Sequence, residues 1–339
     1  LARLRKGHVG AQFWSVYVSA ALDDQHAVQA TLEQIDVTRR LVAAYPGDLQ
    51  LATSAADVEK AMKAGRIASL IGMEGGHSIG GSLGVLRQMY ALGARYMTLT
   101  HFKNTPWADS ATDKPEHDGL TDFGRDVVRE MQRIGMLVDL SHTSEATMMD
   151  TLAVARAPVI FSHSNARAIN HHTRNASDTV LKALAANGGI IMVNVFPTYV
   201  VEETRQWNAV RAGEKARLEA LYIGEPEAAA KGLKDWEAAH PMPRGAIKDV
   251  ADNIDHIVAV SGIDHVGLGG DFDGVGTTVV GMEDVSTYPA LFAELARRGH
   301  SQADLEKIAS GNMLRVMKAA EAYAAAHRAD PPIESPTAF

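Results

Sequence analysis

The sequence predicts an α/β protein of parallel βα units, a (β/α)8 TIM barrel whose first strand is missing from the 339 residues of this chain. Three observations lead to this prediction. Strand-like apolar runs alternate with helical patterns through most of the chain. The length is normal for such a barrel with one or two insertions. Several runs also end in metal-binding or proton-transferring side chains, which a parallel barrel gathers at one mouth.

Seven runs are expected to form strands, and in chain order they span 12–18, 68–73, 96–100, 137–141, 159–162, 190–195 and 266–269. The expected helices span 25–44, 57–64, 83–92, 123–134, 145–155, 178–186, 246–260, 288–298 and 303–325. Cap residues support two of them: Ser177 precedes one helix and Ser301-x-x-Asp304 begins the last. A barrel needs an eighth strand, and we expect it to precede Leu1.

The chain is expected to form a single barrel domain over residues 1–330. The longest departure from the βα rhythm is 198–243, which is rich in Ala, Glu and Lys and is expected to be a helical insertion. Its place after a strand predicts a lid over the mouth or a subunit contact. The C-terminal tail, 331–339, is expected to be loosely held.

Composition narrows the possible partners. The net charge of −8 and the lack of a long Lys/Arg run argue against nucleic acid or an anionic membrane, and favour a small-molecule substrate. No run approaches the length of a membrane span, and residues 1–6 do not resemble a signal peptide. With no cysteine, a transition metal must be held by His and carboxylates. These features are compatible both with a cytoplasmic protein and with an exported one.

Glu74, His142 and His163 are the candidate metal ligands. Each directly follows an apolar run, and the two histidines are one βα unit apart. One carboxylate and two imidazoles form a common zinc ligand set that leaves positions for water and substrate, and a Glu can bridge two metals. A lone histidine is more often structural, but this joint placement favours a site.

His101 and Asp271 also follow apolar runs and are the candidate catalytic residues. Asp271 follows Gly267-Leu-Gly-Gly, whose glycines let backbone and ligand approach closely. It could ligate a metal or move a proton from metal-bound water to a leaving group. Asp273, nearby, is expected to be a turn residue.

Two glycine-rich motifs bear on other enzyme classes. Gly75-Gly-His-Ser-Ile-Gly-Gly81 lacks the G-K-[ST] ending of a phosphate loop, which argues against nucleotide binding. Gly80-Gly-Ser-Leu-Gly84 matches the G-x-S-x-G pattern of serine hydrolases. A nucleophile elbow needs a strand running directly into the serine, and here the strand ends near Met73. Ser82 is therefore a weak rival nucleophile.

These residues lie in motifs that resemble the membrane (renal) dipeptidases, binuclear zinc dipeptidases among the amidohydrolase-like barrels. The likeness covers nearly the whole chain. It is strongest in Ile71-Gly-Met-Glu-Gly-Gly-His-Ser78, Leu99-Thr-His101, Asn104-Thr-Pro-Trp-Ala-Asp109, Asp139-Leu-Ser-His142, Pro158-Val-Ile-Phe-Ser-His-Ser164 and Gly269-Gly-Asp-Phe-Asp-Gly274.

The resemblance implies a reaction in which a hydroxide bridging two zinc ions attacks a peptide carbonyl. Glu74 is similar to the bridging carboxylate of the family, and His142 and His163 to the remaining ligands of the second zinc. His101 resembles the histidine that stabilises the tetrahedral intermediate. Asp271 resembles the aspartate that takes the proton from the bridging water and passes it to the leaving amine.

The same resemblance implies a dipeptide substrate, tolerance of a D-residue at its C-terminal side, and a homodimer. Arg174, within His172-Thr-Arg-Asn175, is similar to the arginine that binds the C-terminal carboxylate of the substrate, and Tyr199 to a tyrosine that helps it. The residues alone leave both open, because a loop arginine is usually solvated and Tyr199 could be packing.

One departure from the family affects the metal count. The family has an Asp-x-His-x-Asp motif on its first strand that completes the first zinc site, and no such motif occurs in this chain. We expect the motif on the missing strand, before Leu1. The alternatives are a degenerate, non-catalytic barrel, or another amidohydrolase-type barrel acting on a cyclic amide or lactone. The latter enzymes usually use a carbamylated strand-end Lys, whereas the bridge candidate here is Glu74.

Overall fold

The computed structural model describes residues 1–334 and contains one parallel sheet. The hydrogen-bonded strand order is β1-β3-β4-β5-β6-β7-β8, and β2 pairs with β3 off this path. The strands are β1 Ala11–Ser15, β2 Leu49–Leu51, β3 Ile67–Glu74, β4 Ala94–Thr98, β5 Leu137–Asp139, β6 Ile160–Phe161, β7 Ile190–Asn194 and β8 Val266–Gly270. The predicted α/β barrel architecture is confirmed as a curled parallel sheet, with β1 and β8 at the two ends of the path.

All seven expected strands are present, and one further strand was missed. That strand, β2, has the sequence Leu-Gln-Leu and is only three residues long. Alternation over so few residues cannot be told from chance, so no pattern indicated it. It pairs with residues 67–69 of β3 and therefore extends the sheet without closing it.

Five strands, β1, β4, β5, β6 and β7, end earlier than expected, and three of these precede site histidines. The strands β4, β5 and β6 end at Thr98, Asp139 and Phe161, ahead of the predicted ends at 100, 141 and 162. His101, His142 and His163 therefore lie just beyond the strands. Leu99 and Leu140, which directly follow β4 and β5, are fully buried, and their apolar character lengthened the predicted strands. Glu74 is the last residue of β3, one residue beyond the predicted strand end at 73.

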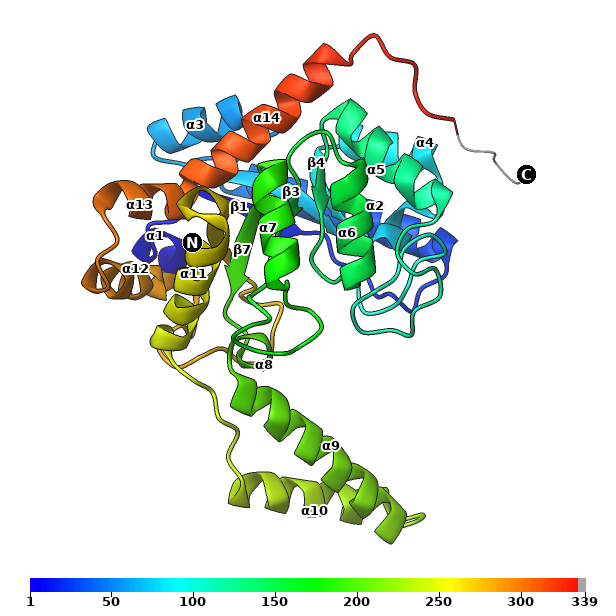
Figure 1. Cartoon of the computed structure of the whole chain (residues 1–339), viewed down its shortest axis with the longest axis vertical. Coiled ribbons are helices and arrows are strands. Elements are labelled where there is room, and N and C mark those ends of the chain that lie inside the picture. Colours follow the sequence, from blue (N-terminus) through cyan, green and yellow to red (C-terminus); the bar gives the residue numbers. More distant parts are fainter. Residues whose placement is uncertain (335–339) are drawn as a thin grey trace.

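Helices surround the sheet (Figure 1). They are α1 Ala2–Lys6, α2 Asp24–Ala44, α3 Ala55–Lys63, α4 Leu83–Ala91, α5 Asp122–Ile134, α6 Glu145–Val154, α7 Asp178–Asn187, α8 Pro197–Val200, α9 Glu202–Leu221, α10 Pro226–Ala239, α11 Ile247–Ser261, α12 Tyr288–Arg297, α13 Gln302–Glu306 and α14 Asn312–Ala326. The expected helix 303–325 is thus divided into α13 and α14 by a π-helical turn, Lys307–Gly311. Side-chain caps start many of these helices; Ser177 accepts from Val180 N and Ser301 forms a capping box.

Helices α8, α9 and α10 occupy the segment in which a helical insertion was expected. Figure 1 shows α9 and α10 as a hairpin that projects away from the body of the molecule. Only Thr204 and Leu218 of α9, and Ala229 of α10, are buried. A role of this hairpin as a lid or a subunit contact stays a prediction.

The C-terminal segment is described as far as residue 334, so 335–339 of the expected loose tail lie outside the described residues. Within the described part, Ile333 is tied to the body of the molecule. Its N–H donates to Glu130 Oε2 at 3.2 Å, and its carbonyl accepts from Arg87 at 3.1 Å.

Across residues 1–334, we find no helix with the combination of length and apolar character that a bilayer span needs.

Close packing of the sheet requires glycine at position 72. A Cβ built on Gly72 would lie 2.1 Å from two ring atoms of Tyr96, the neighbouring residue on β4. Both residues are buried, and because protein interiors are close-packed the Tyr96 ring cannot move aside without displacing its neighbours.

We therefore predict that Gly72→Ala destabilises the protein by about 1–3 kcal/mol through overpacking. Gly213→Ala is the matched control, because Gly213 lies on exposed α9 and a Cβ added there would have nothing within 4 Å. That change should leave stability unaltered or raise it by up to about 1 kcal/mol through helix propensity. Thermal denaturation measures both; equal melting temperatures for the two variants would contradict the packing explanation.

Candidate metal centre

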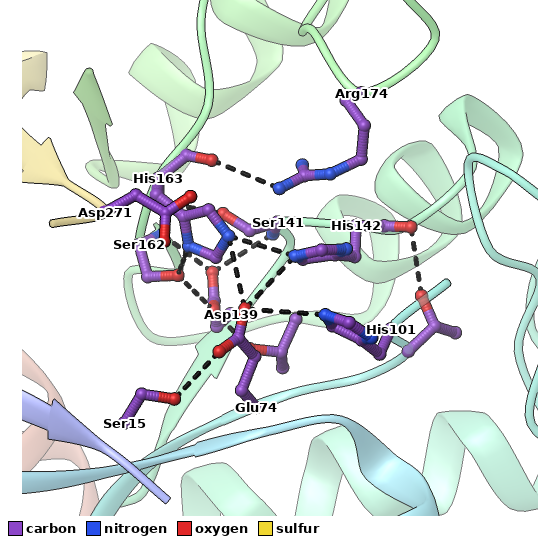
Figure 2. Close-up of polar contacts among 12 residues, drawn as sticks. Ser15, Glu74, His101, Asp139, Ser141, His142, Ser162, His163, Arg174 and Asp271 are labelled. Atoms are coloured by element: carbon purple, nitrogen blue, oxygen red, sulfur yellow. Dashed lines mark hydrogen bonds and ion pairs between the residues drawn. The ribbon is translucent and has the colours of Figure 1, made fainter. Parts of the chain in front are cut away.

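The site residues lie where the strands end. Glu74 is the last residue of β3. The other four residues follow strands: His101 follows β4, His142 follows β5, His163 follows β6 and Asp271 follows β8. Because the strands are parallel, these five positions meet at one edge of the sheet (Figure 2). The structure thus brings together the residues that the sequence singled out separately.

Three of these side chains converge on one point. Oε1 of Glu74 lies 3.2 Å from Nε2 of His142 and 3.4 Å from Nε2 of His163. The two Nε2 atoms are 3.0 Å apart, and the three ligand atoms all lie within 4.8 Å of one another. The second oxygen of Glu74, Oε2, accepts from the Ser15 hydroxyl at 2.8 Å, which orients the carboxylate.

The chemistry of this group fits a divalent cation. Desolvation lowers the pKa of both His142 and His163 well below the ordinary value of 6.5. Both rings are therefore neutral near pH 7, which is the form that binds metal. Two neutral imidazoles and a carboxylate with their donor atoms turned toward each other form a zinc-type ligand set.

His101 lies beside this group without joining it. Its Nε2 is 3.7 Å from Oε1 of Glu74, and its ring centroid is 4.2 Å from that of His142. Desolvation lowers the pKa of His101 to about 4, although Glu74 opposes the shift. Tyr17 and Phe102, both about half exposed, pack against the His101 ring at centroid distances of 4.9 and 4.0 Å. A neutral imidazole in this place can donate one hydrogen bond to a substrate.

Asp271 lies across the group from His101, in a left-handed backbone conformation with φ of 61°. Its Oδ2 accepts from the side-chain amide of Asn194, the last residue of β7, at 2.9 Å. Burial, and then the negative charge of Glu74, raise the pKa of Asp271 to about 7. A carboxyl group with this pKa can both take up and release a proton near neutral pH. Asp273 lies in the turn that follows, as expected.

Arg174 is a buried cation without an ionic partner in residues 1–334. It is 1% exposed, and its guanidinium donates to Ser164 Oγ at 3.2 Å and to the His163 carbonyl at 3.4 Å, while Nε has no partner. The Tyr199 ring lies 5.1 Å beneath it. Burying an unpaired charge is costly, so this arrangement favours an anionic ligand.

The loop that carries Arg174 is held by buried asparagines. Asn175 donates from its side chain to the carbonyls of Asn170 and Tyr199, both at 2.9 Å, and Asn170 donates to Thr198 O at 3.0 Å. These bonds join the loop after β6 to the segment after β7. The sequence pattern gave no sign of this support, because isolated asparagines in a polar loop usually face solvent.

Asp139 is a site residue that the sequence reasoning missed. It is fully buried, and its carboxylate accepts from the backbone N–H groups of Ser141 and Ser162 and from the hydroxyls of Thr98 and Ser162. Burial raises the pKa of Asp139, and these hydrogen bonds oppose the shift. As the last residue of β5 it satisfies the strand-end criterion, but the strand was expected to reach 141.

Ser82 does not have the setting of a nucleophile. It is the N-cap of α4, where its hydroxyl accepts from Val85 N at 3.3 Å. The strand before it ends at Glu74, so no strand runs directly into the serine. The G-x-S-x-G match is therefore a helix cap.

Comparison with known proteins gives a consistent result. The family model described as membrane dipeptidase (peptidase family M19) matches residues 1–331. Dipeptidase 3 from Macaca fascicularis is 43% identical over 99% of this chain, and Dipeptidase 3 from Rattus norvegicus is 43% identical over 95% of it. The chain spans 61% and 58% of the lengths of these two relatives.

Solved structures agree in fold. The probable dipeptidase PvdM from Pseudomonas aeruginosa matches with a TM-score of 0.85 and 26% identity, covering 95% of this chain and 88% of that one. A metallo peptidase from Rhodobacter sphaeroides matches with a TM-score of 0.78 and 23% identity, covering 94% of this chain and 89% of that one. The second likeness bears on the fold alone.

We predict that His142→Ala and His163→Ala each lower the content of bound divalent metal, because each removes one candidate ligand of a three-residue group. Ligand loss should weaken binding by at least the roughly 10–100-fold seen when only an outer partner of a ligand is removed. Elemental analysis after dialysis measures the metal content. His26→Ala is the control, because His26 is an exposed residue near the start of α2. Unchanged metal content in both site variants would exclude this metal centre.

Proposed function

Because this chain belongs to the membrane dipeptidase family, we propose that it is a zinc-dependent dipeptidase whose substrate is a dipeptide. One structural observation carries the proposal. A buried arginine without an ionic partner in residues 1–334, Arg174, lies against the group formed by Glu74, His142 and His163. An anion-binding group beside a metal-binding group suits a peptide whose terminal carboxylate is close to its scissile bond.

Arg174 selects short substrates in this proposal. Its guanidinium binds the C-terminal carboxylate, and a carboxylate is the planar partner that a guanidinium pairs with best. Tyr199 is 8% exposed and makes edge-to-face contacts with His172 and Phe196 at centroid distances of 4.7 and 5.1 Å, which hold it under the guanidinium. One amino acid residue separates that carboxylate from the bond to be broken, so a longer C-terminal segment does not fit.

Zinc held by Glu74, His142 and His163 would supply Lewis-acid polarisation of the carbonyl and an activated water. His101 donates a hydrogen bond to the carbonyl oxygen as negative charge develops on it. Asp271 accepts a proton on its carboxylate and then donates it to the leaving amine. The hydrogen bond from Asn194 keeps that carboxylate directed at the site.

A D-residue at the C-terminal position of the dipeptide is part of the proposal. The Rhodobacter sphaeroides metallo peptidase is described as liganded with a phosphinate mimic of the dipeptide L-Ala-D-Ala. Recognition through the carboxylate supports tolerance of either configuration, because Arg174 contacts a group that both enantiomers carry. Two zinc ions per subunit, and a homodimer, stay predictions.

We predict that Arg174→Ala lowers kcat/KM for dipeptides by about 10–100-fold, because a charge-assisted hydrogen bond contributes about 1.5–3 kcal/mol. The matched substrate control is the same dipeptide with a C-terminal amide, which has no carboxylate for Arg174 to bind. Arg174→Ala should change hydrolysis of that amide little. An equal loss on both substrates would contradict the assigned role.

Metal removal tests the reaction class. Treatment with a chelator should abolish dipeptide hydrolysis, and added Zn²⁺ should restore it, because the rival nucleophile Ser82 is a helix cap. Hydrolysis that survives the chelator and is blocked by a fluorophosphonate probe would exclude the metal-dependent reaction. Ser82→Ala is the control, and it should affect only stability through its cap, by roughly 1 kcal/mol.

A further inference from the structure

The two candidate ligand histidines differ in how their second ring nitrogen is held. Nδ1 of His163 lies 2.7 Å from the hydroxyl of Ser162. Nδ1 of His142 is buried and has no hydrogen-bond partner in the described residues. Both rings direct Nε2 toward Glu74, so the difference lies entirely on the side away from the metal-binding point.

The Ser162 hydroxyl links His163 to a buried carboxylate. Its Oγ lies 2.6 Å from Oδ2 of Asp139 and 2.7 Å from Nδ1 of His163 (Figure 2). A serine hydroxyl has one hydrogen to donate. The Asp139 carboxylate already accepts from the backbone N–H groups of Ser141 and Ser162 and from the Thr98 hydroxyl, which is the setting of an acceptor-only carboxylate. The serine hydrogen then points to Asp139, and the ring nitrogen is the donor toward Ser162.

We propose that Asp139, acting through Ser162, is a positioning residue that holds His163 as the Nδ1–H tautomer and so leaves the Nε2 lone pair free for a metal. The chain of bonds is His163 Nδ1–H to Ser162 Oγ, and Ser162 O–H to Asp139 Oδ2. The inference rests on the proposed metal site. It adds that the tautomer of one ligand, His163, is set before the metal binds.

The acceptor end of this chain is held from several sides. Oδ1 of Asp139 accepts from the backbone N–H of Ser141 at 3.0 Å and of Ser162 at 2.8 Å. Oδ2 accepts from Thr98 Oγ1 at 2.6 Å as well as from Ser162. Backbone N–H groups can only donate, so Oδ1 is an acceptor whatever the hydroxyls do. Four donors on one carboxylate leave it little freedom to turn.

Packing also restricts the serine. A Cβ built on Gly269 of β8 would lie 2.2 Å from the carbonyl oxygen of Ser162 and 2.9 Å from Cα of His163. The β8 backbone therefore contacts the Ser162–His163 peptide directly. This contact supports a fixed position for the hydroxyl, and hence for the ring.

His142 serves as the internal comparison. It has no equivalent of Ser162, and its Nε2 lies 3.0 Å from Nε2 of His163. If Nε2 of His163 carries a lone pair in this contact, Nε2 of His142 must carry the hydrogen in the metal-free protein. It would then have to change tautomer to bind a metal, which His163 would not.

The first test compares two variants that each remove one hydroxyl from Asp139 Oδ2. Ser162→Ala breaks the link to His163, whereas Thr98→Ala keeps it. Zn²⁺ affinity of the metal-free full chain is measured by competition with a chromophoric chelator. Ser162→Ala should bind Zn²⁺ about 10–100-fold more weakly, as is usual when the partner of a ligand is removed. Thr98→Ala should stay close to the wild-type affinity. Equal losses in the two variants, or none in Ser162→Ala, would overturn the proposal.

The second test observes the tautomer itself. In a long-range ¹H–¹⁵N spectrum of the metal-free wild type, His163 should carry its hydrogen on Nδ1, and an Nε2–H form would overturn the proposal. Ser162→Thr, which keeps a hydroxyl, should retain the tautomer and the affinity. The wild-type spectrum decides the matter even if Ser162→Ala does not fold. A wild type that binds no Zn²⁺ yet shows the Nδ1–H form would refute the proposed function alone.

Discussion

The carboxylate of Asp139 joins the ends of three neighbouring strands, and the geometry of the site depends on this connection. It belongs to β5, and it accepts hydrogen bonds from Thr98 at the end of β4 and from Ser162 just beyond β6. The two residues that it holds by their backbone N–H, Ser141 and Ser162, immediately precede His142 and His163. A change in the position of this one carboxylate would move both imidazoles.

Uncompensated charge is the second constraint. Glu74, Asp271 and Arg174 lie close together, Arg174 is 1% exposed, and burial is the largest cause of the shift of the Asp271 pKa to about 7. Such groups are costly in the absence of ligands, so the fold must supply the stability elsewhere. The main hydrophobic cluster, which spans β3 through β8 and the helices around them, is the source of that stability.

The α9–α10 hairpin contrasts with the rest of the structure. Few of its residues are buried, and Val210, Leu221 and Ile223 are largely exposed. Its base, with Phe196, Trp207 and Met242, lines a cavity of about 670 Å³ that also reaches Gly276 and Thr277, a few residues beyond Asp271. The sequence of the hairpin can therefore change with little effect on the stability of the barrel, while the base of the hairpin stays near the site.

The sequence by itself determined the seven main strands, most helices and the five strand-end residues Glu74, His101, His142, His163 and Asp271, because hydrophobic period and chain direction are local properties. It did not determine β2, the strand ends at Thr98 and Asp139, or the role of Asp139, because these depend on which backbone groups find partners across the sheet. The burial of Arg174 could not be predicted from the sequence either, because an arginine in a loop is usually solvated and only the folded chain covers this one. Only the tertiary structure decided which polar residues face one another.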